Sequence, residues 1–211
     1  MNYNKGYNLG EIVKINGDIF VPKGYKGDTN IIVPDEIVKY CAEHFGLLDP
    51  IEKVIDPMCG VGTIPRVINS LGGNCIGIEI DENRYLAAAQ SVNSENLILG
   101  DFREVYGKKG MFKCIFTSMP FIWFRNVVPG LNVDQNFALK FAELLKPDGF
   151  VLLDSIPIVE RDRQVWPVAS LQSEYLNRNG FMLETVIIFD NKKHIDTSPH
   201  SVVMKFNKTR Q

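Results

Sequence analysis

The feature that most constrains the fold is an alternation of short apolar segments with amphipathic ones. The segments expected to form strands are residues 53–56, 74–79, 96–101, 112–117, 150–154, 181–189 and 201–206. Apolar side chains recur at helical spacing in residues 34–45, 63–71, 82–92, 136–145 and 168–177. Strands that alternate with helices predict a parallel sheet with helices on both faces. A polar loop joins the last two strands, which predict an antiparallel pair.

The length of the chain bounds the number of domains. With 211 residues, of which 45% are hydrophobic, the chain can build one substantial core but is short for two. We therefore predict one α/β domain over residues 34–211, with a doubly wound, mostly parallel sheet and an antiparallel C-terminal strand pair. Residues 1–33 form an N-terminal extension, in which residues 11–20 predict a small hairpin that turns at Asn16-Gly17.

Charge and cysteine content exclude several classes of protein. A net charge of −2 argues against binding nucleic acid by bulk charge alone. No apolar run reaches the ~18 residues of a transmembrane helix, and residues 1–5 lack the apolar core of a signal peptide, so we expect no membrane partner. The four cysteines form no C-x-x-C pair and predict reduced thiols in a cytoplasmic protein, without a disulfide scaffold or a metal site.

The ends of the expected strands carry the residues that indicate a binding site. In open α/β sheets, ligands bind beyond the carboxyl ends of the strands, where the strand order reverses. Acids end several of the expected strands, and three of them, Asp56, Glu79 and Asp101, are the acids that we assign to this site. The glycine-rich residues 56–63 follow the first acid and would let the backbone approach a ligand closely. They lack the lysine of a phosphate loop, and Pro65 stands where a dinucleotide fingerprint requires its third glycine.

The three acids indicate a ligand that is cationic and nucleoside-like. Asp56 would repel a pyrophosphate but would pair with an α-amino group or a sulfonium. Glu79 lies about 20 residues further on, as expected for a carboxylate that accepts hydrogen bonds from both ribose hydroxyls. Asp101 would bond an exocyclic amine while the Phe102 ring packs on an adenine face. S-adenosylmethionine combines all three groups. The alternative is a structural glycine turn beside solvated acids.

These motifs resemble the Rossmann-like S-adenosylmethionine-dependent methyltransferases, especially the DNA amino-methyltransferases that modify adenine N6 or cytosine N4. Residues 56–63 are similar to the D-P-F-x-G-S-G-T cofactor motif, residues 77–81 to the second motif and residues 100–102 to the adenine-binding corner. Residues 32–39 resemble the helix start that touches the methionine part, and residues 200–208 resemble the closing strand. The resemblance implies S-adenosylmethionine as the cofactor, held by Ile32, Val33, Pro34, Asp56, Pro57, Met58, Cys59, Gly60, Gly62, Thr63, Glu79, Ile80, Asp101 and Phe102.

The resemblance also implies a catalytic segment at Ser118-Met119-Pro120-Phe121. The family carries an acid, Asn or Ser, then two prolines and an aromatic residue, and Met119 here replaces the first proline. The Ser118 side chain and the Met119 carbonyl would accept hydrogen bonds from the target amine, Pro120 would fix the turn, and Phe121 would stack on the target ring. The alternative is a plain strand-ending turn with buried aromatic side chains.

The substrate is the least constrained part of the hypothesis. The resemblance implies methyl transfer to an exocyclic amine of a nucleobase in DNA or RNA. However, residues 122–136 are too short for the recognition domain that DNA methyltransferases usually carry. Target recognition would then come from a second copy of the chain or from a partner subunit. Two alternatives stay open: a methyltransferase for a small molecule or protein side chain, and a catalytically weak cofactor-binding subunit that needs a partner.

Overall fold

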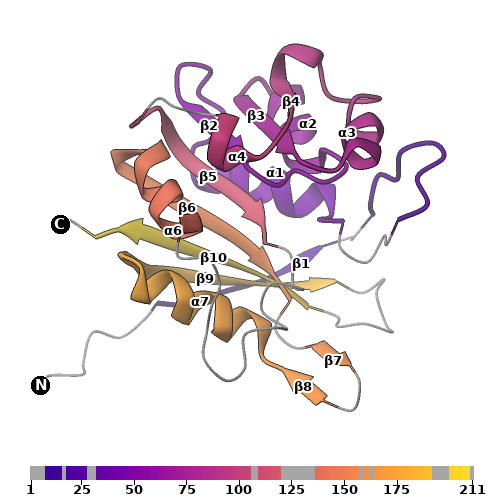
Figure 1. Cartoon of the computed structure of the whole chain (residues 1–211). Coiled ribbons are helices and arrows are strands. Elements are labelled where there is room, and N and C mark those ends of the chain that lie inside the picture. Colours follow the sequence, from indigo (N-terminus) through magenta and orange to yellow (C-terminus); the bar gives the residue numbers. More distant parts are fainter. Residues whose placement is uncertain are drawn as a thin grey trace, which may run out of the picture.

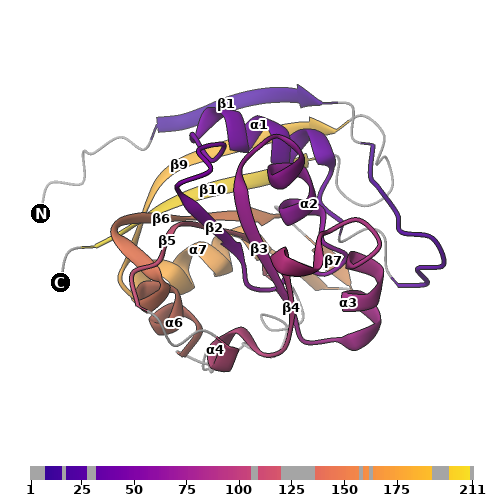
Figure 2. The same ribbon diagram turned by 90° about the horizontal axis from the view of Figure 1, so that it is seen from above.

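The computed structural model describes residues 8–15, 18–27, 32–105, 109–119, 136–156, 159–161, 164–191 and 200–209. They form an eight-stranded sheet in the order β1-β9-β10-β6-β5-β2-β3-β4 (Figures 1 and 2). Its strands are β1 (Asn8–Ile15), β2 (Lys53–Asp56), β3 (Asn74–Glu79), β4 (Leu97–Leu99), β5 (Phe112–Ser118), β6 (Leu145–Ser155), β9 (Phe181–Asn191) and β10 (His200–Lys208). A separate pair consists of β7 (Val159–Arg161) and β8 (Gln164–Trp166).

Helices cover both faces of the large sheet, as Figure 2 shows. On one face, α1 (Asp35–His44) and α2 (Thr63–Ser70) share a buried cluster with the strands. On the other face, α6 (Asn136–Leu144) and α7 (Val168–Arg178) share a second buried cluster. The remaining helices are α3 (Glu82–Ala88), the short 3-10 helix η2 (Ser94–Asn96) and α4 (Phe102–Val105). The doubly wound α/β fold predicted from the sequence is therefore confirmed.

The central strands are covered on both faces, which explains why their sequences are continuous apolar runs. Along β5, Cys114 and Phe116 pack into the cluster beneath α1 and α2, whereas Ile115 packs into the cluster beneath α6 and α7. Successive side chains of a strand point to opposite faces, so a strand covered on both sides needs apolar residues at every position. The core therefore lies on both sides of β5 and β6.

The strand order places a binding crevice at the ends of β2 and β5. From β2 the sheet continues through β3 to β4 in one direction, and from β5 it continues to β6 in the other. All these neighbouring pairs are parallel. The order reverses between β2 and β5, where ligands bind in folds of this kind. Asp56 ends β2 and Ser118 ends β5, so the topology brings two sequence-predicted segments together.

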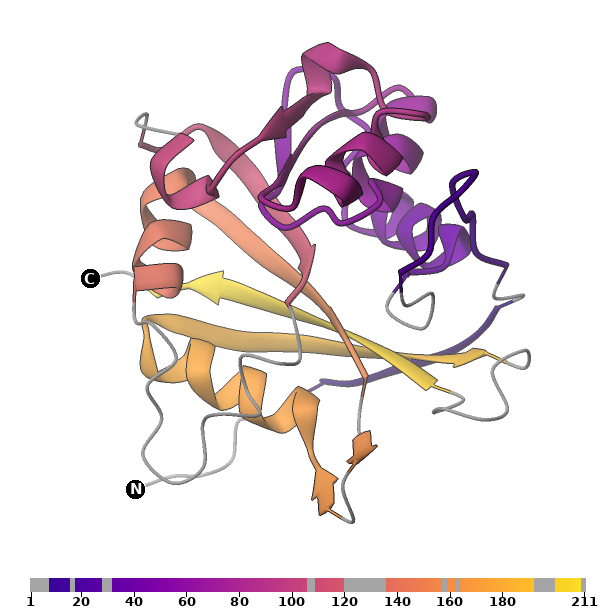
Figure 3. The ribbon, with the colours of Figure 1, turned by 45° about the vertical axis from the view of Figure 1, so that its right-hand side comes forward.

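The C-terminal strands also follow the prediction. Strand β10 lies between β6 and β9 and runs antiparallel to both. The unpredicted pair β7–β8 follows β6 directly and extends away from the large sheet in Figure 3. Each of its strands has three residues, which is too short for a pattern of alternating side chains to be recognised.

The expected hairpin in residues 11–20 is wrong. Strand β1 pairs in parallel with β9, with Ile12 opposite Ile188, and Asp18–Phe20 form no strand. Asn16-Gly17 lies outside the described residues. Pairing with β9 gives β1 a whole edge of the sheet, and it packs Val13 and Ile15 against the cluster beneath α1 and α2. A two-stranded hairpin offers no such burial. No helix among the described residues is long and apolar enough to cross a membrane.

Candidate functional site

The turn between β2 and α2 uses its two glycines differently. Gly60 and Gly62 have φ angles of 57° and 83°, in the left-handed region that favours glycine. A Cβ atom on Gly62 would lie 2.8 Å from Val92 Cγ2 and 3.0 Å from Ala88 Cβ, so packing of this turn requires a glycine there. A Cβ atom on Gly60 would meet nothing within 4 Å. Gly60 therefore faces open space.

Glu79 at the end of β3 holds this turn in place by hydrogen bonding. Its carboxylate is 4% exposed; Oε2 accepts a hydrogen bond from the Gly60 amide and Oε1 one from the Asp81 amide, both at 2.8 Å. The structure therefore brings together two motifs that the sequence predicts to hold one cofactor. The next residue, Ile80, is 66% exposed and offers an apolar surface beside the carboxylate.

A third glycine, which the sequence analysis did not single out as a site residue, allows this turn to pack on β3. A Cβ atom on Gly77 would lie 2.9 Å from both Cys59 Sγ and Pro65 Cγ. Cys59 is buried, and its amide donates to the Ile78 carbonyl at 2.8 Å. Burial raises the pKa of the Cys59 thiol well above its usual value. Cys59 is thus a protonated packing residue.

Asp56 is a buried carboxyl group directly behind the turn. It is 2% exposed, and burial raises its pKa to about 7. The nearby Thr117 hydroxyl and the Met58 amide, which donates to Oδ1 at 3.2 Å, oppose that shift. Pro57 and Thr63 on either side are buried as well, and Met58 is half-buried. A buried carboxylate with an elevated pKa is stabilised by a cation, which fits the charge predicted for the ligand.

The segment before α1 closes one side of this region. Ile32, Val33 and Pro34 are buried, and Ile32 packs with Val61 of the glycine turn and Ala87 of α3. This placement agrees with the predicted proximity of residues 32–34 to the cofactor turn.

The N-terminal extension also reaches this region, which the sequence did not predict. Arg66 of α2 forms a salt bridge of 2.5 Å with Asp35 and lies over the Phe20 ring, 4.5 Å from its centroid. Residues 23–27 line a cavity of about 500 Å³ together with α3 and with Asp81, two residues beyond Glu79. The extension is therefore part of the wall beside the second motif.

The predicted adenine corner is packed more tightly than expected. Asp101 accepts hydrogen bonds of 2.9 Å from Arg103 Nε and from the Arg103 amide, and this bonding lowers the pKa of Asp101. The Phe102 ring is 4% exposed and stacks on Phe137, with centroids 5.3 Å apart, while Phe141 lies 5.8 Å away. A purine contact by Asp101 and Phe102 stays a prediction, but this Phe102 ring offers little free surface.

The predicted catalytic segment begins where β5 ends. Ser118 is half-buried, Met119 is 4% exposed, and Pro120 and Phe121 lie outside the described residues. The Met119 carbonyl accepts a hydrogen bond of 3.3 Å from Gln172 Nε2 of α7. Gln172 is 1% exposed, and its Oε1 has no hydrogen-bond partner among the described residues. Sequence reasoning missed Gln172, because only the tertiary fold brings α7 to the end of β5.

A second buried acid lies beside Ser118. Asp154 of β6 is opposite Ser118 in the parallel register and is 7% exposed. Burial raises the pKa of Asp154 to about 7, and a hydrogen bond with the Ser118 side chain opposes that shift. The charge of Asp154 also raises the pKa of Asp56. The sequence did carry a signal for Asp154, since it ends an expected strand as Asp56, Glu79 and Asp101 do.

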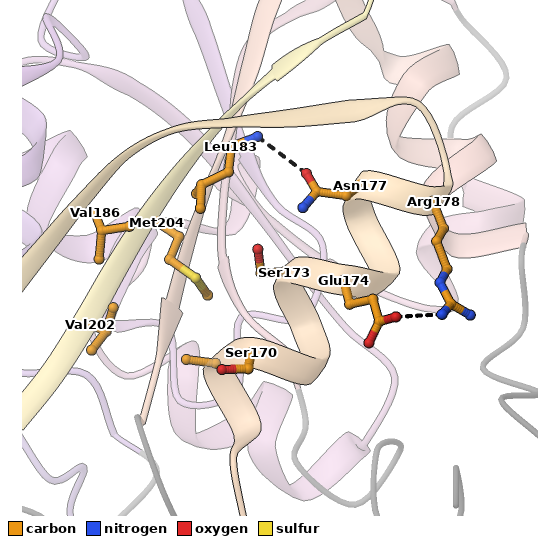
Figure 4. A pocket seen from close by; sticks show the side chains of 10 residues that line it. Ser170, Ser173, Glu174, Asn177, Arg178, Leu183, Val186, Val202 and Met204 are labelled. Atoms are coloured by element: carbon orange, nitrogen blue, oxygen red, sulfur yellow. Dashed lines mark hydrogen bonds and ion pairs between the residues drawn. The ribbon is translucent and has the colours of Figure 1, made fainter. Parts of the chain in front are cut away.

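A cavity larger than the one beside Asp81 lies elsewhere (Figure 4). It has a volume of about 690 Å³ and lies between α7 and strands β9 and β10. Figure 4 shows Ser170, Ser173, Glu174 and Asn177 along the helix, and an ion pair between Glu174 and Arg178. None of the site residues predicted from the sequence lines this cavity.

Comparison with known proteins supports the fold independently. No family model matches the sequence, and neither does any curated protein. Among solved structures, a candidate RNA methyltransferase from Pyrococcus horikoshii shares 16% identity, with a TM-score of 0.59 over 90% of this chain and 93% of that one. An S-adenosylmethionine-dependent methyltransferase from Aquifex aeolicus shares 14% identity, with a TM-score of 0.57 over 82% and 89%.

A third structure comes from Burkholderia thailandensis and is a 1,6-didemethyltoxoflavin-N1-methyltransferase with bound 1,6-didemethyltoxoflavin and S-adenosylhomocysteine. It shares 15% identity, with a TM-score of 0.60 over 83% of this chain and 77% of that one. The chain therefore has the Rossmann-like fold of S-adenosylmethionine-dependent methyltransferases. The substrates of these proteins differ, so the fold alone selects none of them.

Proposed function

We propose that this protein is an S-adenosylmethionine-dependent methyltransferase that acts on an exocyclic amine of a nucleobase in DNA or RNA. The observation that carries the proposal is the junction at the switch point. There the Glu79 carboxylate holds the Gly60 amide at 2.8 Å, beside the buried acid Asp56. This arrangement combines an acid for ribose hydroxyls, an open glycine turn and a carboxyl group that favours a cation.

The residues present fit the cofactor. Gly60 leaves space where a side chain would intrude, Asp56 would face the positive charge, and Glu79 would receive the ribose. Ile80 would provide an apolar contact for the purine. When bound, S-adenosylmethionine supplies an electrophilic methyl group. This chain's own residues then have to orient the acceptor and exclude water from it.

Ser118 and Met119 support an amine as the acceptor. The Met119 carbonyl has two lone pairs, of which Gln172 uses one, so the other is left for a substrate N–H group. The Ser118 oxygen would accept a second N–H. Two acceptors directed at one nitrogen hold it in place and leave its own lone pair free to attack. Met119 stands where the family has a proline, and it keeps the backbone carbonyl that this role requires.

A small-molecule amine is the second candidate substrate. One of the similar structures belongs to an N1-methyltransferase that holds a heterocyclic small molecule. Residues 122–136 are also too few for a recognition domain. A nucleobase in a duplex would have to be flipped out, at roughly a few kcal/mol, so single-stranded nucleic acid is the first polymer to test. A second copy or a partner subunit would supply recognition of a duplex.

Calorimetric titration with S-adenosylmethionine and S-adenosylhomocysteine tests the cofactor site. We expect micromolar dissociation constants for the wild type and loss of binding in Glu79→Ala. Glu95→Ala, which removes an exposed acid of η2, should bind as the wild type does. Transfer of labelled methyl groups to single-stranded DNA, to RNA and to free adenosine and cytidine then separates the substrate classes. A wild type that binds neither compound contradicts the proposal.

A further inference from the structure

Ser118 and Asp154 form a pair at the edge where the acceptor would bind. They are opposite each other in the last register pair of β5 and β6, at the carboxyl ends of both strands. The Ser118 side chain lowers the pKa of the Asp154 carboxyl group, in line with this proximity. A serine has one hydroxyl proton and two lone pairs. When that proton is given to Asp154, the Ser118 oxygen can act toward a substrate only as an acceptor.

The surroundings of Asp154 leave part of its bonding capacity free. The residue is 7% exposed, and its Oδ1 has no hydrogen-bond partner among the described residues. Buried carboxylate oxygens in folded proteins are nearly always paired, so an unpaired one needs a reason. The Gln172 Oε1 atom is also unpaired, and its own amide nitrogen binds the adjacent Met119 carbonyl. Thus each residue of the Ser118-Met119 segment has a neighbour with an oxygen that lacks a partner among the described residues. Asp154 is the neighbour of Ser118, and Gln172 is the neighbour of Met119.

We propose that Asp154, acting through the Ser118 hydroxyl, is the base that takes the proton released when the acceptor nitrogen is methylated. The proposal rests on the proposed methyltransferase function and specifies its substrate: a neutral nitrogen that carries at least one N–H bond. The family resemblance assigns no role to Asp154.

The proton transfer balances without any further reactant. The N–C bond forms while the bond between sulfur and the methyl carbon breaks, and that electron pair remains on sulfur. The nitrogen, now positively charged, gives a proton to the Ser118 oxygen as the Ser118 proton passes to the Asp154 carboxylate. The products are a neutral methylated amine and a protonated Asp154, which returns its proton to water in a later step. A base whose pKa lies near the working pH is best suited to this task, and burial raises the pKa of Asp154 to about 7.

Among the residues that the structure describes, few other titratable groups influence Asp154. The Cys41 thiol of α1 and the Asp56 carboxyl of β2 interact with it electrostatically, and Ser118 of β5 bonds it. From β10, the residue opposite Asp154 is the apolar Val203. Burial raises the pKa of Cys41 well above its usual value, so this thiol stays neutral when Asp154 titrates. Asp56 is the described group near Asp154 whose pKa lies in the same range, and its proposed role is in cofactor binding rather than in proton transfer.

The test compares Asp154→Asn with Asp148→Asn, the same substitution at an exposed position near the other end of β6. Methyl transfer to single-stranded DNA and RNA oligonucleotides of mixed sequence is followed from pH 5.5 to 9 at saturating S-adenosylmethionine. We expect the wild-type kcat to fall below about pH 7 and Asp154→Asn to lose about 10²–10⁴-fold in kcat, together with that pH dependence. Its cofactor affinity should stay near the wild-type value. Ser118→Ala should lose both as well, and Asp148→Asn should match the wild type.

The possible failures are distinguishable. A wild type that methylates none of the oligonucleotides overturns the proposed substrate class and, with it, the role of Asp154. A wild type that transfers methyl groups while Asp154→Asn keeps the same kcat and pH profile overturns only the role of Asp154. If Asp154→Asn loses cofactor binding together with activity, Asp154 supports the fold or the cofactor site and is not the base. Circular dichroism and thermal unfolding of each variant establish that it is folded.

Discussion

The two halves of the sheet prepare their binding groups in opposite ways. On the β2–β3–β4 side, both carboxylate oxygens of Glu79 accept backbone N–H groups, and Asp101 is held by Arg103. On the β5–β6 side, Asp154 and Gln172 each keep a buried oxygen without a partner among the described residues. The acids of the first half are therefore held by hydrogen bonds before any ligand arrives. The second half has polar atoms without partners among the described residues, which a hydrogen-bonding ligand would satisfy.

Asp56 lies at the border of the two halves. Its titration should have the largest of the effects predicted below, which is on the free energy of unfolding. The pKa of its carboxyl is about 7 in the folded protein and near 3.9 in an unfolded chain. Between these values the unfolded carboxyl loses its proton while the buried one keeps it. The free energy of unfolding should therefore fall as the pH rises from about 4 to 7, by an upper limit of about 4 kcal/mol for one such carboxyl.

Urea unfolding of the ligand-free protein at a series of pH values measures this slope. In Asp56→Asn the slope should be smaller than in the wild type, and Asp154→Asn should reduce it too. Bound S-adenosylmethionine should reverse the trend for Asp56, because a cation favours its charged form, so cofactor affinity should rise through pH 7. Equal slopes in the wild type and Asp56→Asn would show that this carboxyl is not buried in the uncharged form.

The two glycines of the cofactor turn separate stability from binding. Gly62→Ala places a Cβ atom 2.8 Å from a Val92 methyl group and also strains a left-handed backbone, so it should lower the free energy of unfolding by about 2–4 kcal/mol. Gly60→Ala meets no neighbouring atom, so it should cost only about 1–2 kcal/mol for its left-handed backbone. Its main effect should be weaker cofactor binding. Chemical unfolding and calorimetry on both variants test the contrast, which fails if Gly60→Ala binds the cofactor normally.

A substitution of Gln172 tests the β5–β6 side of the site, where the acceptor would bind, without disturbing the β2–β3–β4 side, where the cofactor would bind. Gln172→Met keeps the length of the side chain but removes its bond to the Met119 carbonyl, which we expect to lower kcat about 5–10-fold while the cofactor dissociation constant is unchanged. Asn179→Leu is the control, since the Asn179 side chain also donates to a backbone carbonyl, that of Tyr175, at 2.7 Å. Steady-state kinetics and calorimetry give both quantities. A change confined to cofactor affinity would contradict the positioning role of Gln172.

The smallest expected effect comes from the ion pair between Lys146 and Glu52, at 2.5 Å. It joins the start of β6 to the segment before β2, at the amino ends of the strands and away from the candidate site. Both side chains are about one-third exposed, so a double-mutant cycle should give only about 0.2–1 kcal/mol, and less at high salt. Neither cofactor affinity nor kcat should change. A coupling energy well above this range would mean that the pair is less screened than its exposure indicates.

The sequence predicted most of what depends on local patterns. The bounds of β2 and β3 match the predicted residues, because each is a short apolar run with a polar residue on either side. The contact between the glycine turn and Glu79 follows from strand ends that meet at one edge of a parallel sheet. The doubly wound architecture follows from the alternation itself.

What the sequence could not reveal depends on contacts between distant segments. Asp154 and Gln172 become site residues only because β6 and α7 meet the end of β5, and no local pattern marks Gln172. Gly77 is required by the atoms of Cys59 and Pro65, which lie above it only in the folded chain. The burial of Phe102 beneath Phe137 likewise depends on α6, which is far away in the sequence. From the sequence we expected this ring to pack on the adenine of a ligand, whereas in the structure it packs in the hydrophobic core.

The pairing of β1 with β9 has a consequence for how the chain is synthesised. Asn8 lies opposite Thr185, so β1 is made long before the strand that it pairs with. Until then β1 has no β9 to pair with, and β9 in turn would have a free edge without β1. Free strand edges recruit other strands and promote aggregation. Contacts of such long sequence separation also slow folding. We therefore expect the newly made chain to depend on chaperones until β9 emerges, and its tendency to aggregate to be set by this closing step.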